Sequence, residues 1–266
     1  MKKLLLIPYA LWMLIFVVFP LLLMAAYSFI DLSGNITLNN YASFFSSNYI
    51  QMTLSSFWYA FLITLFTLIV SYPLALALNA TKRKTIWLLI IILPTWINLL
   101  LKTYAFIGIF GKNGILNDIF AVFNIDEIQL LFSDTAFIIV SVYIFLPFML
   151  LPLFNAISGI DNNLLNAAKD LGATRVQVFS KIILPLTADG IKAGIQVVFI
   201  PSLSLFMITR LITGNKVITL GTAIEQQFLT NENWGMGSTI GIFLVIFMLL
   251  IMVITSGKSD NRVMKL

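Results

Sequence analysis

Nine residues with polar, charged or aromatic side chains lie in or beside strongly apolar stretches of this sequence. In a lipid environment such side chains are rare, and they commonly mark ligand or ion pathways. Hydroxyl, amide and cationic groups can solvate a polar solute, and aromatic faces can attract an ammonium group. The candidates for a solute path are Trp96, Asn98, Lys102, Tyr104, Tyr143, Ser202, Ser204, Phe206 and Arg210.

Each of these residues also has a purely structural interpretation. Aromatic residues at the ends of membrane spans commonly form interfacial belts, and serines in spans commonly bond to their own helix. Lys102 can reach the outer surface with its long side chain. Pro201 frees a backbone carbonyl, which is tolerated only against protein or a wet cavity. Both interpretations stay open for every residue of the set.

The residue types that catalysis inside a membrane requires are missing. The chain has no Cys and no His, so thiol chemistry, disulfides, and the commonest general base and metal ligand are excluded. No Asp or Glu lies in the middle of an apolar stretch, and no Gly-x4-Gly-Lys-Ser/Thr sequence is present to bind ATP. We therefore expect no catalytic site, no metal site and no cofactor bound by this chain.

The elements that hold the candidate residues are predicted to be membrane helices. Of 266 residues, 60% are hydrophobic and 10% are charged, whereas soluble domains carry about 25% charged residues. A helix needs about 20 apolar residues to cross a bilayer. The fold class is therefore all-α and polytopic, with the first helix a retained anchor kinked at Pro20. Six stretches are long enough: Leu4–Ile30, Leu54–Asn79, Ile86–Phe110, Thr135–Ile157, Thr187–Thr209 and Gly235–Ser256.

The distribution of positive charge predicts the orientation. Lys and Arg gather on the cytoplasmic side of membrane proteins, and twelve of the 16 in this chain fall on one side of the predicted spans. That side holds both termini and a short turn over 81–85. The net charge of +5 therefore reflects topology and does not indicate a nucleic-acid partner. The twelve are Lys2, Lys3, Lys82, Arg83, Lys84, Lys169, Arg175, Lys181, Lys192, Lys258, Arg262 and Lys265.

The same topology predicts the outer side and the domain organisation. Outer loops are expected over 31–53, 111–134 and 210–234, and they contain seven of the 11 acidic residues, including Glu225 and Glu232. We expect three parts in the chain. Residues 1–53 form an N-terminal helix and first outer loop, residues 54–256 form the transmembrane core, and residues 257–266 form a cytoplasmic tail.

One polar segment between the fourth and fifth spans predicts two short helices joined at a glycine. Asp161 can cap the first helix, and Gly172 provides the left-handed residue that ends it. Thr174 and Gln177 have capping-box spacing for the second helix, and Pro185 is expected to end that helix. Such an amphipathic helical hairpin either docks into a groove of a partner or lies at the membrane surface.

This segment resembles the cytoplasmic coupling loop of ABC importer permeases: Glu-Ala-Ala, three residues, Gly, nine residues, Ile-x-Leu-Pro. The match is ungapped and departs at Asn166, where that family usually has Glu. The missing carboxylate removes a charge-assisted contact, although an amide can still form hydrogen bonds. The resemblance implies that a separate ATPase docks on this loop through Asn166, Ala167, Ala168, Asp170, Leu171, Gly172, Ile182, Leu184 and Pro185.

The whole chain is similar to the first permease subunit of the spermidine/putrescine ABC importers. The resemblance implies a bacterial plasma (inner) membrane complex of a second homologous permease, two ATPase subunits that bind ATP and Mg²⁺, and an extracytoplasmic substrate-binding protein. Its cargo would be a small molecule crossing the lipid bilayer. The stretches that carry this wider resemblance are Leu6–Tyr9, Phe19–Leu21, Leu93–Ala105, Ile200–Phe206, Leu220–Gly221 and Ile224–Phe228.

One feature argues against a polyamine cargo. A polycation in a low dielectric favours nearby carboxylates, yet the charges closest to the expected path are Lys102 and Arg210. Members of the similar family can carry an acid near the end of the fifth span, where this chain has Arg210. Either the partner permease supplies acids or the cargo is another solute, such as an amino acid or an anion. A noncatalytic membrane scaffold is the remaining alternative.

Overall fold

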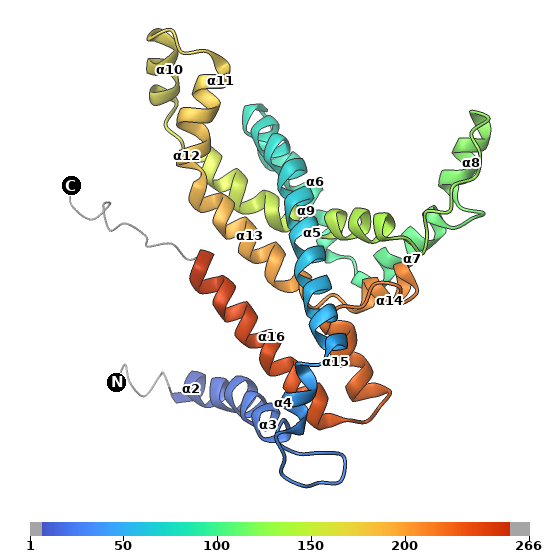
Figure 1. Cartoon of the computed structure of the whole chain (residues 1–266). Helices are drawn as coiled ribbons and strands as arrows, with labels where there is room; N and C mark the ends of the chain where they lie inside the picture. The colour runs from blue at the N-terminus through green and yellow to red at the C-terminus, as the bar shows by residue number, and fades with distance from the viewer. Residues whose placement is uncertain (1–6, 256–266) are drawn as a thin grey trace.

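The computed structural model describes residues 7–255, and every regular element in that range is helical (Figure 1). Five of the basic residues used to predict the orientation lie outside the described residues: Lys2, Lys3, Lys258, Arg262 and Lys265. The elements are α2 (Ile7–Met13), η1 (Leu14–Val18), α3 (Phe19–Tyr27), α4 (Asn39–Phe44), α5 (Ser47–Ala80), α6 (Lys84–Ile92), η2 (Leu93–Trp96), α7 (Leu99–Phe110), α8 (Ile115–Val122), α9 (Asp134–Ser158), α10 (Asn162–Asp170), α11 (Arg175–Val178), η3 (Phe179–Ile183), α12 (Leu184–Leu186), α13 (Ala188–Ser202), α14 (Met207–Thr213), α15 (Leu220–Leu229) and α16 (Trp234–Thr255).

The predicted all-α membrane fold is confirmed. Five helical segments within residues 7–255 are long and apolar enough to cross a bilayer. A sixth is counted when two helices bent by 62° at Thr187 are taken as one span, Arg175–Leu186 with Ala188–Ser202. The 34-residue α5 begins at Ser47, earlier than the predicted start at Leu54.

The centre of the molecule is formed by α5, α9 and α13, which pack against one another. Phe137 and Leu150 of α9 are fully buried there. Small residues allow the close approach of α13 to α9, because a Cβ at Gly190 would lie 2.5 Å from the Cβ of Ala156 and one at Gly194 would overlap Met149. This use of small residues is typical of helix packing in membranes.

A second core joins the C-terminal helix α16 to α3, α4 and α15. The rings of Phe44 and Phe243 stack with centroids 3.9 Å apart. The side-chain amide of Asn40 is buried and donates to the carbonyls of Ser28 and Ile30. The predicted outer loop over 31–53 is therefore partly wrong, since it contains α4 and the start of α5 held against α16.

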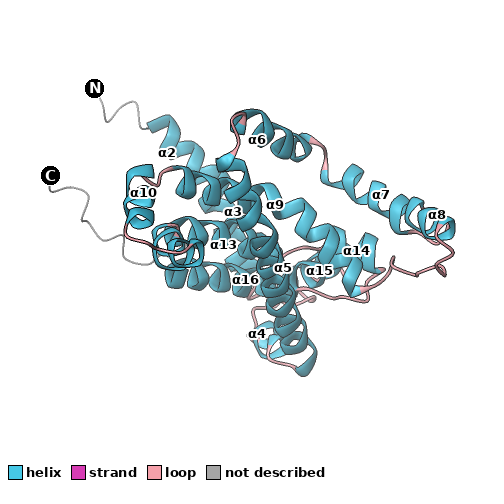
Figure 2. Ribbon diagram, turned by 90° about the horizontal axis from the view of Figure 1, so that it is seen from above, coloured by secondary structure: helices cyan, strands magenta, loops and turns pink. Residues whose placement is uncertain are grey.

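Two parts of the chain extend away from these cores. Figure 1 shows α2 leading away from the bundle, and Figure 2 shows α7 and α8 reaching outward past α14. Large apolar side chains along Ile7–Tyr27 are exposed in the isolated chain. In a bilayer such a surface faces lipid or another helix, because backbone polar groups are already bonded within the helix.

Two of the prolines directly follow π-helical turns. The N–H of Phe19 bonds to the carbonyl of Leu14 just before Pro20, and the N–H of Leu184 bonds to the carbonyl of Phe179 just before Pro185. Each wider turn absorbs the bond that proline cannot donate. The prediction that Pro185 ends its helix is off by one residue, because the helix ends at Leu186 and the chain bends at Thr187.

Two predicted spans are interrupted. The stretch Ile86–Phe110 is broken between η2 and α7, because Ile97 is extended and Asn98 starts a new helix. The stretch Thr187–Thr209 is broken after Ser202, and the chain turns before α14. The segments expected as outer loops over 111–134 and 210–234 contain α8 and α15.

Candidate functional site

The turn between α13 and α14 faces the start of α7 across a pocket of about 420 Å³. Three residues of the predicted solute path line it: Lys102 from α7, and Ser204 and Phe206 from the turn. Pro201 also lines it, next to a hydrogen bond from the Ser204 hydroxyl to the Pro201 carbonyl. Among the described residues no carboxylate lies within ion-pair distance of Lys102.

The other residues of the predicted path do not line this pocket. Trp96 and Tyr104 have exposed side chains. Asn98 caps α7 by accepting the N–H of Leu100 at 2.8 Å. The ring of Tyr143 meets Phe106 edge-on.

Ser202 is the member of the set with the clearest structural role. It is fully buried and donates to the carbonyl of Val198 within α13, 2.6 Å away. Its hydroxyl is therefore used by its own helix.

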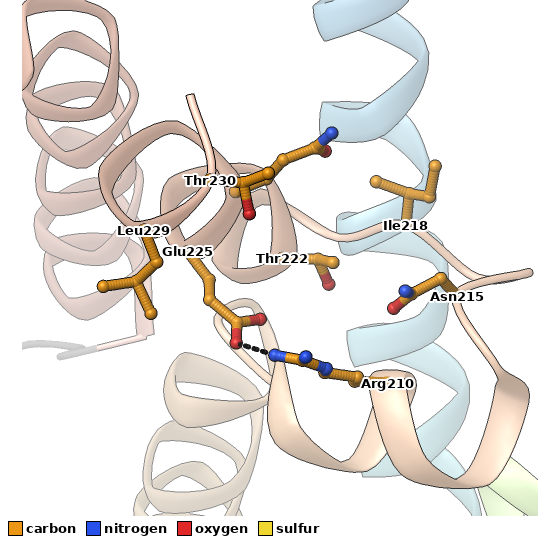
Figure 3. A pocket seen from close by; sticks show the side chains of 8 residues that line it. Arg210, Asn215, Ile218, Thr222, Glu225, Leu229 and Thr230 are labelled. Atoms are coloured by element: carbon orange, nitrogen blue, oxygen red, sulfur yellow. Dashed lines mark hydrogen bonds and ion pairs between the residues drawn. The ribbon is translucent and has the colours of Figure 1, made fainter. Parts of the chain in front are cut away.

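Arg210 lies in a different pocket, of about 390 Å³, between α14 and α15 (Figure 3). Its guanidinium donates to a Glu225 carboxylate oxygen at 2.8 Å. The Glu225 side chain is only 15% exposed, whereas that of Arg210 is 62% exposed. Thr222, Asn215 and Thr230 complete much of the polar lining.

Sequence reasoning missed that α15 is held inside the protein. The hydroxyl of Thr219 caps the helix and also bonds the carbonyl of Leu205. The N–H of Leu220 donates to the buried Ser56 hydroxyl at 2.7 Å. Gly221 packs directly on the backbone of Ser204. The sequence signal for this packing was Thr219, which can cap a helix, followed by the small residues Gly221 and Ala223. The packing of α15 brings Glu225 close to Arg210.

The polar segment after α9 forms two short helices, as predicted. The Asp161 carboxylate accepts the N–H of Asn163 and starts α10. Gly172 has a φ of +79°, and Thr174 with Gln177 forms a complete capping box at α11. These local predictions are confirmed, and α10 with α11 forms the upper end of the molecule in Figure 1.

The residues of the predicted coupling loop occupy three parts of this hairpin. Asn166, Ala167, Ala168 and Asp170 belong to α10. Leu171 is 88% exposed at the end of that helix, beside Gly172. The remaining residues, Ile182, Leu184 and Pro185, lie on η3 and α12 below.

An open pocket of about 670 Å³ separates α10 from α11 and η3. Its lining combines apolar Leu165 and Val178 with basic Lys169 and Arg175. A short helix pair of this shape, with an apolar and basic surface, can receive a segment of a partner protein.

Tyr72 joins this hairpin to the core. Its hydroxyl lies 2.7 Å from that of Thr187, the residue at the 62° bend. Its ring meets Phe179 edge-on with centroids 5.7 Å apart. These two contacts connect η3 and the bend at Thr187 to α5.

The sequence matches the family model of the binding-protein-dependent transport system inner membrane component over residues 43–257. It is 36% identical to the spermidine/putrescine transport system permease protein PotB of Haemophilus influenzae, covering 96% of this chain and 93% of the relative. It is 35% identical to PotB of Escherichia coli K12 over 91% of this chain and 92% of the relative.

Solved structures agree with these matches at the level of fold. A chain of a bacterial alginate ABC transporter superposes with a TM-score of 0.83 at 20% identity, covering 99% of this chain and 95% of that one. A chain of the MetNI methionine ABC transporter gives 0.59 at 16% identity, covering 79% and 95%. The protein is thus a multi-pass inner-membrane permease subunit of an ABC importer, and it belongs to the family of binding-protein-dependent transport system inner membrane components.

Proposed function

We propose that this chain and a second homologous permease form the path by which spermidine and putrescine are imported. Permeases of this family are noncatalytic and work with a binding protein and an ATPase. Two ATPase subunits would bind ATP and Mg²⁺, and an extracytoplasmic binding protein would deliver the cargo. The observation that carries the cargo assignment is near-full-length similarity to relatives named for spermidine/putrescine transport.

The ion pair between Arg210 and Glu225 supports a cationic cargo. The sequence provided a reason against a polyamine cargo, because it showed no acidic residue that would pair with Arg210 near the expected path. Glu225 neutralises that charge from within the same chain, 2.8 Å away. A paired cation repels an incoming ammonium group much less than an isolated one.

The proposed path runs along the pocket between α7 and the α13–α14 turn. Lys102, Ser204 and Phe206 line it. Trp96, Tyr104 and Tyr143 are exposed outside this pocket and would offer aromatic faces to ammonium groups. Asn98 and Ser202 would act by fixing the helices beside the path. Lys102 favours a second candidate, an anion or an amino acid, because no carboxylate in the described residues pairs with it.

The proposed coupling element is the α10–α11 hairpin. Small Ala167 and Ala168 would let the ATPase backbone approach closely, while exposed Leu164 and Leu171 would enter apolar parts of its groove. The movement would pass through Ile182, Leu184 and Pro185 toward α13. The amide of Asn166 would replace the usual carboxylate contact with a neutral hydrogen bond.

The proposed orientation places this hairpin, the turn before α6 and both termini in the cytoplasm. The basic residues at Lys82, Arg83 and Lys84 support it. We also retain the division into 1–53, 54–256 and a tail over 257–266 as a proposal.

The experiment is ATPase activity in the reconstituted complex with its own binding protein and a panel of solutes. The proposal expects spermidine and putrescine to stimulate ATP hydrolysis. Stimulation only by an amino acid or an anion would favour the second candidate. Failure of the chain to purify with any ATPase would instead identify a membrane scaffold.

A further inference from the structure

The pocket between α14 and α15 has the features of an ion-exchange site. It holds one largely buried carboxylate, that of Glu225, and one largely exposed cation, that of Arg210 (Figure 3). In the described part of the chain, Arg210 is the one donor that bonds the Glu225 carboxylate. A carboxylate taken out of water requires a positive partner. The partner, however, need not be this arginine.

The two members of the pair differ in their freedom to move. Glu225 sits on α15, whose first turn is buried. Arg210 extends from the last turn of α14, with most of its side chain in solvent. Any rearrangement of the pair will therefore move the guanidinium and leave the carboxylate in place.

Bonds other than the ion pair also join the two helices. The hydroxyls of Thr209 and Thr222 lie 3.0 Å apart across the α14–α15 contact. Thr219 bonds the carbonyl of Leu205, and Leu220 bonds Ser56 of α5. These buried bonds hold the walls of the pocket and do not involve the side chains of Arg210 and Glu225.

We infer that Glu225 is a binding site for an ammonium group of the cargo and that Arg210 is a tethered cation that occupies this site until the cargo displaces it. This inference rests on the proposed polyamine function. A primary amine can form the same charge-assisted bond with the carboxylate as the guanidinium does. The side-chain carbonyl of Asn215, which lines the same space, can accept one of its remaining N–H bonds. The volume of about 390 Å³ accommodates one aminoalkyl end of a linear amine.

The exchange keeps the charge of the site constant. Before arrival of the cargo, Glu225 is neutralised by Arg210; afterwards it is neutralised by the amine, and Arg210 turns to water. The pocket therefore discriminates against neutral and anionic solutes, which cannot replace the guanidinium.

The test compares two neutral variants, Glu225→Gln and Arg210→Gln, in the assembled transporter. The measured quantity is uptake of labelled spermidine per complex in proteoliposomes, with saturating spermidine-loaded binding protein. Glu225→Gln is expected to lower uptake about tenfold or more, since it removes a charge-assisted bond. Arg210→Gln removes the cation that competes with the amine and is expected to raise uptake per complex, because the amine itself neutralises Glu225.

Complex yield and a control variant make the result decisive. Glu127→Gln removes another outer carboxylate, one that pairs with Lys112 at 3.7 Å on an exposed surface, and it should leave uptake unchanged. Equal effects of Arg210→Gln and Glu225→Gln, whether on yield or on uptake per complex, would show that the pair is structural and overturn the inference alone. A wild-type complex that moves no polyamine would overturn both the inference and the proposed function.

Discussion

The hydroxyl of Tyr72 on α5 lies 2.7 Å from the hydroxyl of Thr187, at the bend where the coupling hairpin meets α13. Thr187 also donates to the carbonyl of Ile183 one turn earlier. The Thr187 hydroxyl thus already has a hydrogen-bond acceptor, and the bond from Tyr72 is an additional link to the core. This position makes Tyr72 a link between the bend at the base of the α10–α11 hairpin and α5.

Tyr72→Phe should impair coupling more than stability. It removes one buried hydrogen bond, worth about 1 kcal/mol, and keeps the ring against Phe179. We expect intact complex yield with severalfold less uptake per ATP hydrolysed. Tyr9→Phe, at an exposed position on α2, is the control. An unchanged ratio of uptake to ATP hydrolysis in Tyr72→Phe would show that this hydrogen bond has no role in coupling.

Gly172→Val should uncouple transport while the protein still inserts. Gly172 has a φ of +79° and open space around its Cβ position, so the substitution acts through backbone strain of about 1–2 kcal/mol. Gly34→Val is a matched control, because Gly34 has a φ of +81° and equally open space. Uptake should fall only for Gly172→Val, measured beside co-purification of the ATPase. Equal uptake in the two variants would refute a special role for the hairpin.

Gly221→Ala should destabilise the contact between α15 and the α13–α14 turn. A Cβ at Gly221 would overlap the backbone of Ser204, and backbone atoms cannot move aside as a flexible side chain can. Overpacking of this kind costs about 1–3 kcal/mol. Gly108→Ala on α7 meets nothing within 4 Å and should leave stability unchanged or slightly raised. Thermal unfolding of the purified complex compares the two, and similar midpoints would contradict the described contact.

Cysteine labelling tests the orientation in this Cys-free chain. Ser33→Cys should react from outside with an impermeant maleimide in intact cells, and Thr85→Cys only after permeabilisation. Both positions are exposed. Asn40, although it lies in the expected outer segment, is a poor reporter because its amide is buried against Ser28 and Ile30. Labelling of Thr85→Cys in intact cells would invert the proposed topology.

The features that sequence predicted well depend on short-range bonds. The cap at Asp161, the left-handed Gly172 and the box of Thr174 with Gln177 each involve residues within a few positions of one another. Hydrophobic length likewise predicted an all-α membrane protein, because bilayer thickness sets the length of a span.

The features that sequence missed depend on distant contacts. The segment before Trp234 is polar enough to look like a loop, but the first turn of its helix is buried, and Ser56, far away in the chain, accepts the Leu220 N–H there. The pairing of Arg210 with Glu225 follows from that burial. The break at Asn98 was also hidden, since its cap interrupts an otherwise continuous apolar stretch.

ATP-driven accumulation of labelled spermidine by the wild-type complex tests the central claim most directly. Proteoliposomes would contain this permease, its partner permease, the ATPase subunits and internal ATP with Mg²⁺, with the binding protein supplied outside. The account predicts uptake that requires both the binding protein and ATP and that unlabelled putrescine reduces by competition. Robust binding-protein-dependent uptake of another solute, with none of spermidine, would contradict the polyamine assignment and leave the family assignment intact.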